Sequence, residues 1–304
     1  MRLKAYLLAA DPAWMDASVT SYYELVEEII VSSDKDGLGW TGKSVRSAEC
    51  IERLKEIDVD KKMRFISGHY ARLDHHPVIN DTYQRQVAFD EASKDADWVV
   101  HIDTDEVLAK PAVFKSCLEE ASERGFEAMD FPGRFLYKQV GKNRYLEMCS
   151  RFWRIAAGYP GPVAAIPGTR LRLCRQCDAP LFRVDFRAKS TSLAHSKTAP
   201  VHRVIGEHEG IYHYTWVRDE AAMIRKTETW GHAPDKKWDS ELAHWLWSGR
   251  HPYLTTLSCL WQRGDLTKHL RIVQIPEVPT MPLRERRELV ASQLMPSANV
   301  PFAQ

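Results

Sequence analysis

The sequence predicts an α/β protein with a mainly parallel sheet flanked by helices, followed by a helical C-terminal extension. In the first hundred residues, short apolar runs of strand length alternate with longer stretches whose apolar residues recur every third or fourth position. This alternation is typical of βα units that build a parallel sheet. With 304 residues, the chain exceeds the roughly 100 to 200 residues of a usual domain, so we expect one large unit or two fused subdomains.

Each expected element has a local reason. The first apolar run ends at Asp11-Pro12, Ile29-Ile30-Val31 forms the centre of the second, and Asp81 with Gln84 predicts a capping box at the start of a helix. The expected strands are residues 3–9, 28–32, 63–66, 98–102, 126–137 and 211–216, and the expected helices are residues 17–26, 44–57, 81–93, 112–124 and 218–230.

Composition excludes several classes of protein. Lys plus Arg (42) nearly equals Asp plus Glu (41), so no overall field draws the chain to nucleic acid or an anionic membrane. Apolar stretches are shorter than the about 18 residues that a membrane span needs. Six scattered cysteines predict reduced thiols, and the single Cys174-x-x-Cys177 pattern favours ordinary thiols over a metal or redox site. We therefore expect a cytoplasmic protein without a membrane span.

The acidic triplet Asp103-Thr104-Asp105 is the sharpest candidate for chemistry. It directly follows the apolar run at residues 98–102, and ligands of open α/β sheets bind outside the carboxyl ends of the strands. Two carboxylates one residue apart can hold a hard divalent cation, which would neutralise a diphosphate. Solvated loop acids are the alternative interpretation of so short a pattern.

The surrounding sequence resembles a known family. Residues 97–108, Asp-Trp-Val-Val-His-Ile-Asp-Thr-Asp-Glu-Val-Leu, are similar to the acidic segment of family 2 type glycosyltransferases with the GT-A fold. The resemblance covers roughly residues 1–110 and is weaker at 211–232. It implies a nucleotide-sugar-binding half at residues 1–108, an acceptor-side half at 109–235 and a helical extension at 236–304.

The resemblance also implies roles for residues. Asp103 and Asp105 would hold Mn²⁺ or Mg²⁺ on the donor phosphates, His213 would complete the metal site, and His232 is the second choice. Donor-binding candidates are Asp11, Asp34, Asp36, Arg85 and Asp103, of which Asp34 or Asp36 would lie beside the nucleoside and Arg85 at the diphosphate or sugar. The expected donor is a nucleoside-diphosphate sugar, with a UDP-sugar first in order.

The acceptor side is less defined by the sequence. An inverting enzyme needs a carboxylate that deprotonates the acceptor hydroxyl, and Glu207, Glu209 and Asp130 are the candidates, with surface acids as the alternative. Residues 168–203 hold eight Lys or Arg against two acids, which indicates either a solvated face or a surface for an anionic acceptor. Glycans, lipids and modified nucleic-acid bases all stay open as acceptors.

Other functions compete with glycosyl transfer. The same acids resemble the nucleophile motif of haloacid-dehalogenase-type phosphatases, with Asp103 as nucleophile and Asp105 as general acid, although three βα-like units precede the motif here. Sugar nucleotidyltransferases need a Gly-rich basic loop after the first strand, where this chain has Ala-Ala-Asp-Pro-Ala-Trp. A non-catalytic sugar- or nucleotide-binding module is the third alternative.

Overall fold

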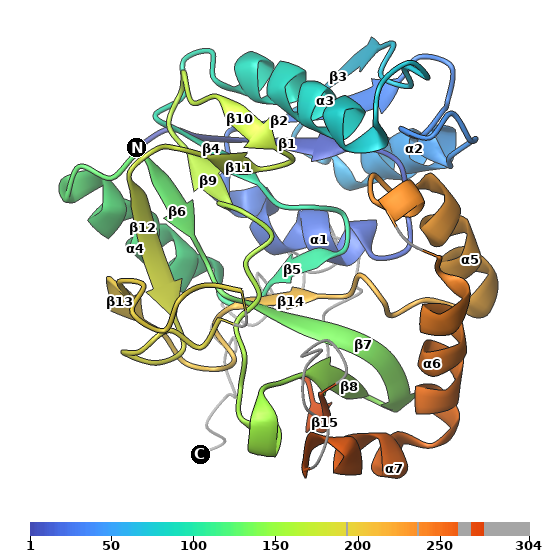
Figure 1. Ribbon diagram of the computed structural model, residues 1–304. Coiled ribbons are helices and arrows are strands. Elements are labelled where there is room, and N and C mark those ends of the chain that lie inside the picture. Colours follow the sequence, from blue (N-terminus) through green and yellow to red (C-terminus); the bar gives the residue numbers. More distant parts are fainter. Residues whose placement is uncertain (193, 236, 261–268, 277–304) are drawn as a thin grey trace, which may run out of the picture.

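The computed structural model describes residues 1–192, 194–235, 237–260 and 269–276 (Figure 1). An eight-stranded sheet has the order β13-β12-β6-β9-β4-β1-β2-β3. The first four strands along the chain, β1 (Leu3–Leu8), β2 (Glu28–Asp34), β3 (Met63–Gly68) and β4 (Trp98–His101), pair in parallel. The rest are β6 (Ala128–Asp130), β9 (Ala164–Ala165), β12 (Leu181–Asp185) and β13 (Arg203–Val204), with β9 antiparallel to both β4 and β6.

Helices cover both faces of this sheet. Leu3, Ala5 and Leu7 share one apolar core with α1 (Met15–Tyr22), α2 (Ser47–Ile57) and α4 (Pro111–Glu123). Tyr6 and Leu8 point the other way and pack with α3 (Pro77–Ala92). Successive side chains of a strand face opposite sides, and both sides of β1 are apolar because both are covered. The predicted α/β class with a mostly parallel, helix-flanked sheet is confirmed.

A second, five-stranded sheet with the order β15-β8-β7-β14-β5 lies below the first in Figure 1. Its strands are β5 (Glu106–Leu108), β7 (Gly133–Gly141), β8 (Arg144–Met148), β14 (Ile211–His213) and β15 (Leu270–Gln274). Because β5 begins one residue after Asp105 and β4 ends two residues before Asp103, the acidic triplet lies where the chain passes from one sheet to the other.

The C-terminal extension packs against this second sheet. It contains α6 (Asp239–Arg250), α7 (Pro252–Leu257) and the short helix η4 (Ser258–Leu260). Trp245 of α6 is fully buried and donates to the carbonyl of Tyr137 in β7 at 3.0 Å. The extension also supplies β15, a strand that the sequence did not predict, and its residues 261–268 and 277–304 lie outside the described part of the chain. No helix among the described residues is long and apolar enough to cross a bilayer.

Three predicted elements differ from the structure. Residues 126–137 form two strands, not one, because Phe131-Pro132 separates β6 in the large sheet from β7 in the second, and proline cannot donate to a strand ladder. Helix α3 begins at Pro77, capped by His76, while the Asp81 side chain bonds Arg85 instead of capping the helix. The strand expected at 211–216 ends at His213, and the chain then turns with Val217 N donating to Tyr214 O.

The remaining elements connect these layers. They are η1 (Tyr23–Leu25), η2 (Arg151–Trp153), the hairpin β10 (Leu171–Leu173) and β11 (Gln176–Cys177), α5 (Glu220–Thr229) and η3 (Ala233–Asp235). Helix α5 follows the turn after β14, and its Lys226 contacts Asp105 of the acidic triplet.

Candidate functional site

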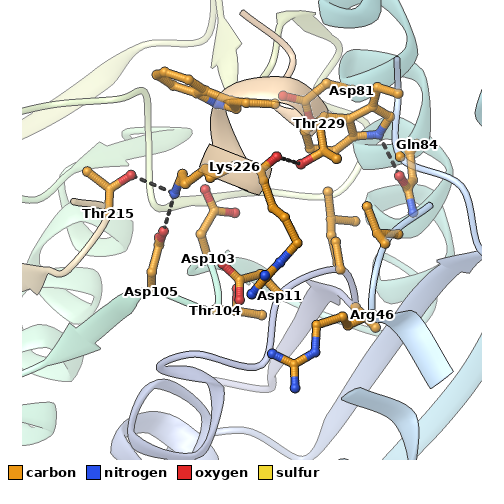
Figure 2. Close-up of a pocket in the computed structure, with 18 of the residues that line it drawn as sticks. Asp11, Arg46, Asp81, Gln84, Asp103, Thr104, Asp105, Thr215, Lys226 and Thr229 are labelled. Carbon is orange, nitrogen blue, oxygen red and sulfur yellow. Dashed lines mark hydrogen bonds and ion pairs between the residues drawn. The ribbon is translucent and has the colours of Figure 1, made fainter. Parts of the chain in front are cut away.

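A cavity of about 280 Å³ lies at the carboxyl ends of β1, β2 and β4 (Figure 2). The predicted residues Asp11, Asp34, Arg85, Asp103, Asp105, His213 and His232 line it. The other ionisable residues in its wall are Asp81, Arg46, Arg175, Arg218, Arg225 and Lys226. The cavity wall therefore holds five aspartates and six cationic Arg or Lys side chains, and among these cations Arg225 has no acidic partner within the described residues.

Asp105 is surrounded by positive charge. Its Oδ2 lies 2.7 Å from Lys226 Nζ and 2.9 Å from Arg218 Nη2, and its Oδ1 lies 3.2 Å from His213 Nε2. Figure 2 shows Lys226 between Asp105 and Thr215. Burial by itself raises the pKa of Asp105, but Lys226, His213 and Arg218 hold that pKa well below its ordinary value. Asp105 is therefore an ionised carboxylate at neutral pH.

Asp103 is held by Arg85, which reaches it from α3. Arg85 Nη1 and Nη2 donate to the two carboxylate oxygens at 2.7 and 3.2 Å, and Arg85 Nε donates to Asp81 at 2.6 Å. Burial raises the pKa of Asp103, yet Arg85 and Arg175 outweigh this and lower it to about 2. Asp103 and Arg85, both predicted as donor-binding residues, thus form a bidentate ion pair in the cavity wall.

These contacts decide whether a divalent cation can bind Asp103 and Asp105. All four carboxylate oxygens of Asp103 and Asp105 already accept from a cationic side chain or from His213. Among the described residues, no three His, Cys, Asp or Glu side chains come together as a metal site. Mg²⁺ needs carboxylate oxygens at about 2.1 Å, so a Mn²⁺ or Mg²⁺ ion held by both aspartates does not fit this arrangement unless Arg85, Lys226 and Arg218 move away from them.

Asp34 and Asp36 follow β2 but differ in their surroundings. Asp34 Oδ1 accepts from the backbone of Asp36 and Leu38, and Oδ2 from Tyr70 and Ala71, so this carboxylate organises two loops at the cavity edge. Burial raises the pKa of Asp34, but these four backbone donors lower it overall. Asp36 is exposed, contacts His69 Nδ1 at 3.1 Å and is not among the cavity-lining residues.

The three proposed catalytic acids lie outside the cavity wall. Asp130, at the end of β6, pairs with Arg183 at 3.2 Å, and burial raises its pKa. Glu207 pairs with Arg187 at 2.8 Å, while Glu209 accepts from Gly206 N at 2.6 Å. Glu207 lines a second hollow of about 820 Å³, whose wall also contains Arg151, Arg154, Arg187, Lys197 and Arg271.

All six arginines of the basic stretch 168–203 have acidic partners. The pairs are Arg170–Asp90, Arg172–Asp178, Arg175–Glu106, Arg183–Asp130, Arg187–Glu207 and Arg203–Glu120. Cys174 lies in the turn of the β10–β11 hairpin and Cys177 in β11, both as free thiols, and burial raises the pKa of Cys174 to about 12. The arginine charges of this stretch are therefore paired with acids, and burial raises the pKa of both thiols.

Sequence analysis missed the cations that complete the site. Lys226 and Arg218 are 121 and 113 positions from Asp105, and Arg175 is 69 positions from Glu106, its buried partner. No local pattern links such distant residues. The sequence did predict that a helix at 218–230, which contains both Arg218 and Lys226, follows a strand at 211–216, but it did not indicate which of their side chains face Asp105.

Comparisons with known proteins give no family. No protein-family model and no curated protein matches the chain. The chain is partly similar to the solved structure of 4-diphosphocytidyl-2C-methyl-D-erythritol synthase from Anaerococcus prevotii, with 13% identity, 54% of this chain and 70% of that chain covered, and a TM-score of 0.33.

Two further solved structures are similar over about half their length. Mannose-6-phosphate isomerase from Helicobacter pylori has 12% identity, coverage of 47% of this chain and 53% of that chain, and a TM-score of 0.27. CMP:2-keto-3-deoxy-manno-octonic acid synthetase complexed with CTP has 12% identity, coverage of 44% and 53%, and a TM-score of 0.28. Likenesses this partial carry no conclusion about what the chain binds or does.

Proposed function

We propose that the chain is a glycosyltransferase that binds a nucleoside-diphosphate sugar in the cavity at the strand ends. One observation carries the proposal: Asp103 and Asp105 lie in the wall of that cavity together with Lys226 and Arg225. Carboxyl ends of parallel strands are where open α/β sheets bind ligands, and a cationic wall suits phosphate groups.

The edge near β2 offers a place for the nucleoside. Trp40 lines the cavity there, and its indole Nε1 donates to Gln84 at 2.7 Å, which fixes the ring. Aromatic rings of this kind stack on nucleobases. The Asp34 carboxylate accepts from four backbone N–H groups of the adjacent loops and so positions this edge of the cavity.

The reaction requires stabilisation of the negative charge that develops on the leaving diphosphate. Transfer breaks the bond between the anomeric carbon and the diphosphate oxygen, forms a bond to the acceptor oxygen and leaves a nucleoside diphosphate. Fixed cations near the leaving group stabilise that developing charge. Arg225 lines the cavity and has no acidic partner among the described residues, and together with Lys226 it is suited to this role.

His232 is our candidate for the proton acceptor. Its Nδ1 lies 2.5 Å from Asp235 Oδ2, and Nε2 makes no hydrogen bond to a described residue. An imidazole oriented by a carboxylate in this way can accept a proton at its other nitrogen. His232 lines the cavity, whereas Glu207, Glu209 and Asp130 do not.

We propose that the acceptor is anionic and binds in the second hollow. The second hollow has five cationic side chains in its wall and one acid, Glu207. Arg187 and Arg271 of that wall contact Glu207 at 2.8 and 3.8 Å, while Lys197 binds the carbonyls of Ser190 and Ser192. Net positive charge in this wall favours an acceptor bearing carboxylate or phosphate groups.

The phosphatase alternative receives less support. A nucleophilic aspartate needs a free carboxylate oxygen aimed at phosphorus, whereas Arg85 binds both oxygens of Asp103. In addition, Asp105 would have to be protonated to serve as general acid, and its three partners hold its pKa far below neutrality.

Donor binding and donor turnover test the proposed function. Thermal unfolding is followed with UDP, GDP, TDP, CDP and CMP, and release of nucleoside diphosphate is followed with the matching sugar donors, UDP-sugars first. A nucleotide at 100 times its Kd should stabilise the protein by about 2.7 kcal/mol. Hydrolysis of phosphate esters without any nucleotide response would instead favour the phosphatase, and nucleotide binding without turnover would favour the non-catalytic module.

A further inference from the structure

We infer that Lys226, and not a divalent cation, links Asp105 to the diphosphate of the donor. The inference rests on the proposed function, because it concerns the same cavity and the same ligand. It departs from what the acidic triplet suggested in the sequence, where two nearby aspartates indicated a Mn²⁺ or Mg²⁺ site.

Two cationic side chains crowd the Oδ2 of Asp105, which leaves no room there for a metal. Lys226 Nζ and Arg218 Nη2 both contact Oδ2, at 2.7 and 2.9 Å, and His213 contacts Oδ1 at 3.2 Å. A cation that bonds the same oxygen at about 2.1 Å would lie within a few ångströms of the Lys226 ammonium. Like charges at that separation in a buried site repel strongly.

Arg218 fixes the carboxylate but does not reach the ligand. Its side chain is 1% exposed. The guanidinium also binds Asp11 through Nε at 2.8 Å and the carbonyls of Tyr214 and Thr215 through Nη1. Nearly all of its donors are therefore used within the protein.

Lys226 retains a donor for the ligand. An ammonium group has three N–H donors, and Lys226 uses one on Asp105 and one on Thr215 Oγ1, both at 2.7 Å. Its side chain is 17% exposed and lines the cavity. The third N–H can donate to a phosphate oxygen, so Asp105 orients a cation that belongs to the chain itself.

Binding of nucleoside diphosphates with and without metal tests the inference. The wild-type protein and Lys226→Gln are titrated with UDP, GDP, CDP and TDP by calorimetry, in EDTA and in Mn²⁺. Lys115→Gln is the matched control, since Lys115 is an exposed lysine of α4 that lies 3.8 Å from Glu119 and outside the cavity wall. Thermal unfolding of each variant shows whether it is folded.

We expect the wild-type Kd for the responding nucleotide to be the same in EDTA and in Mn²⁺. Lys226→Gln should bind about tenfold more weakly in EDTA, the loss of one charged hydrogen bond, and Mn²⁺ should restore part of the loss because Asp105 is then open to a metal. Lys115→Gln should match the wild type in both media.

Three results would overturn the inference, and they can be told apart. If the wild type binds in Mn²⁺ but loses tenfold or more in EDTA, the metal is the link and Lys226 is not, while the proposed function stands. If no nucleoside diphosphate binds in either medium, the proposed function fails and the inference fails with it. Unchanged binding by a folded Lys226→Gln variant in EDTA also excludes Lys226.

Discussion

At the scale of single residues, a buried ion pair behind the acidic triplet holds the two sheets' junction together. Arg175 Nη1 and Nη2 donate to the two oxygens of Glu106 at 2.7 Å each, and Nη1 also donates to the carbonyl of His101 at 2.7 Å. Both side chains are 2% exposed. The pair therefore fixes the end of β4 and the start of β5 on either side of Asp103 and Asp105.

Replacing Arg175 should destabilise the protein strongly. Arg175→Met leaves the charge of Glu106 buried without its partner, which costs about 3–5 kcal/mol. Arg170→Met is the control, because Arg170 precedes the same hairpin but is 78% exposed and pairs with Asp90 only at 3.4 Å, a contact worth at most about 1 kcal/mol. Denaturant unfolding of the two variants measures the difference, and equal losses would refute the role of the buried pair.

What the sequence could predict about the site also depends on single residues. Asp103 and Asp105 were found because only Thr104 separates them and they follow an apolar strand, and the structure places both in the cavity wall. Lys226 and Arg218 approach Asp105 only through the fold, so no local pattern identifies them. Asp36 follows the same strand as Asp34, yet only the burial of each side chain distinguishes their surroundings.

At the scale of elements, prediction succeeded where periodicity was strong. Strands β1, β2 and β4 lie within or close to their expected ranges because both of their faces are covered, which leaves continuous apolar runs in the sequence. Strand β3, at the sheet edge, also lies close to its expected range although none of its residues is fully buried. Prediction was wrong for residues 126–137, where one apolar run serves two sheets. Apolar character alone does not report which sheet a strand joins, and only Pro132 indicates the break.

Helix α5 depends on its cap to position Lys226. Asp219 precedes the helix, and its side chain accepts from Ala222 N at 2.7 Å. Asp219→Ala should lower the free energy of unfolding by about 1 kcal/mol and weaken nucleotide binding, because Lys226 lies in this helix. Asp219→Asn keeps a capping oxygen and should lose much less of both. Equal behaviour of the two variants in thermal unfolding and in titration would argue against the cap.

At the scale of the whole molecule, the segments on either side of the predicted boundary at residue 235 pack closely against each other. Trp245 is fully buried with Tyr137, Leu146 and Met148 of the second sheet, and β15 pairs with β8 from Leu270↔Met148 to Gln274↔Arg144. These contacts lie on the side of that sheet away from the core formed with Trp14 and Ala17. The helical extension is thus part of the core of this sheet.

Removing residues 236–304 should therefore unfold the second sheet. Loss of a buried tryptophan alone costs about 3–5 kcal/mol, against a total stability of about 5–15 kcal/mol for a typical protein, and the shortened chain also loses a strand.

A matched pair of variants in the full chain isolates the contact made by Trp245. Trp245→Ala should lower the unfolding temperature sharply, whereas Trp247→Ala, on the same helix but 45% exposed, should change it little. If the fragment 1–235 melted cooperatively at the temperature of the full chain, the extension would be a separate unit, and the cavity would have to be tested for nucleotide binding in that fragment alone. Lys226 lies before residue 235 and binds Thr215, two residues after β14 of the second sheet, so we expect the fragment to lose nucleotide binding together with its cooperative unfolding.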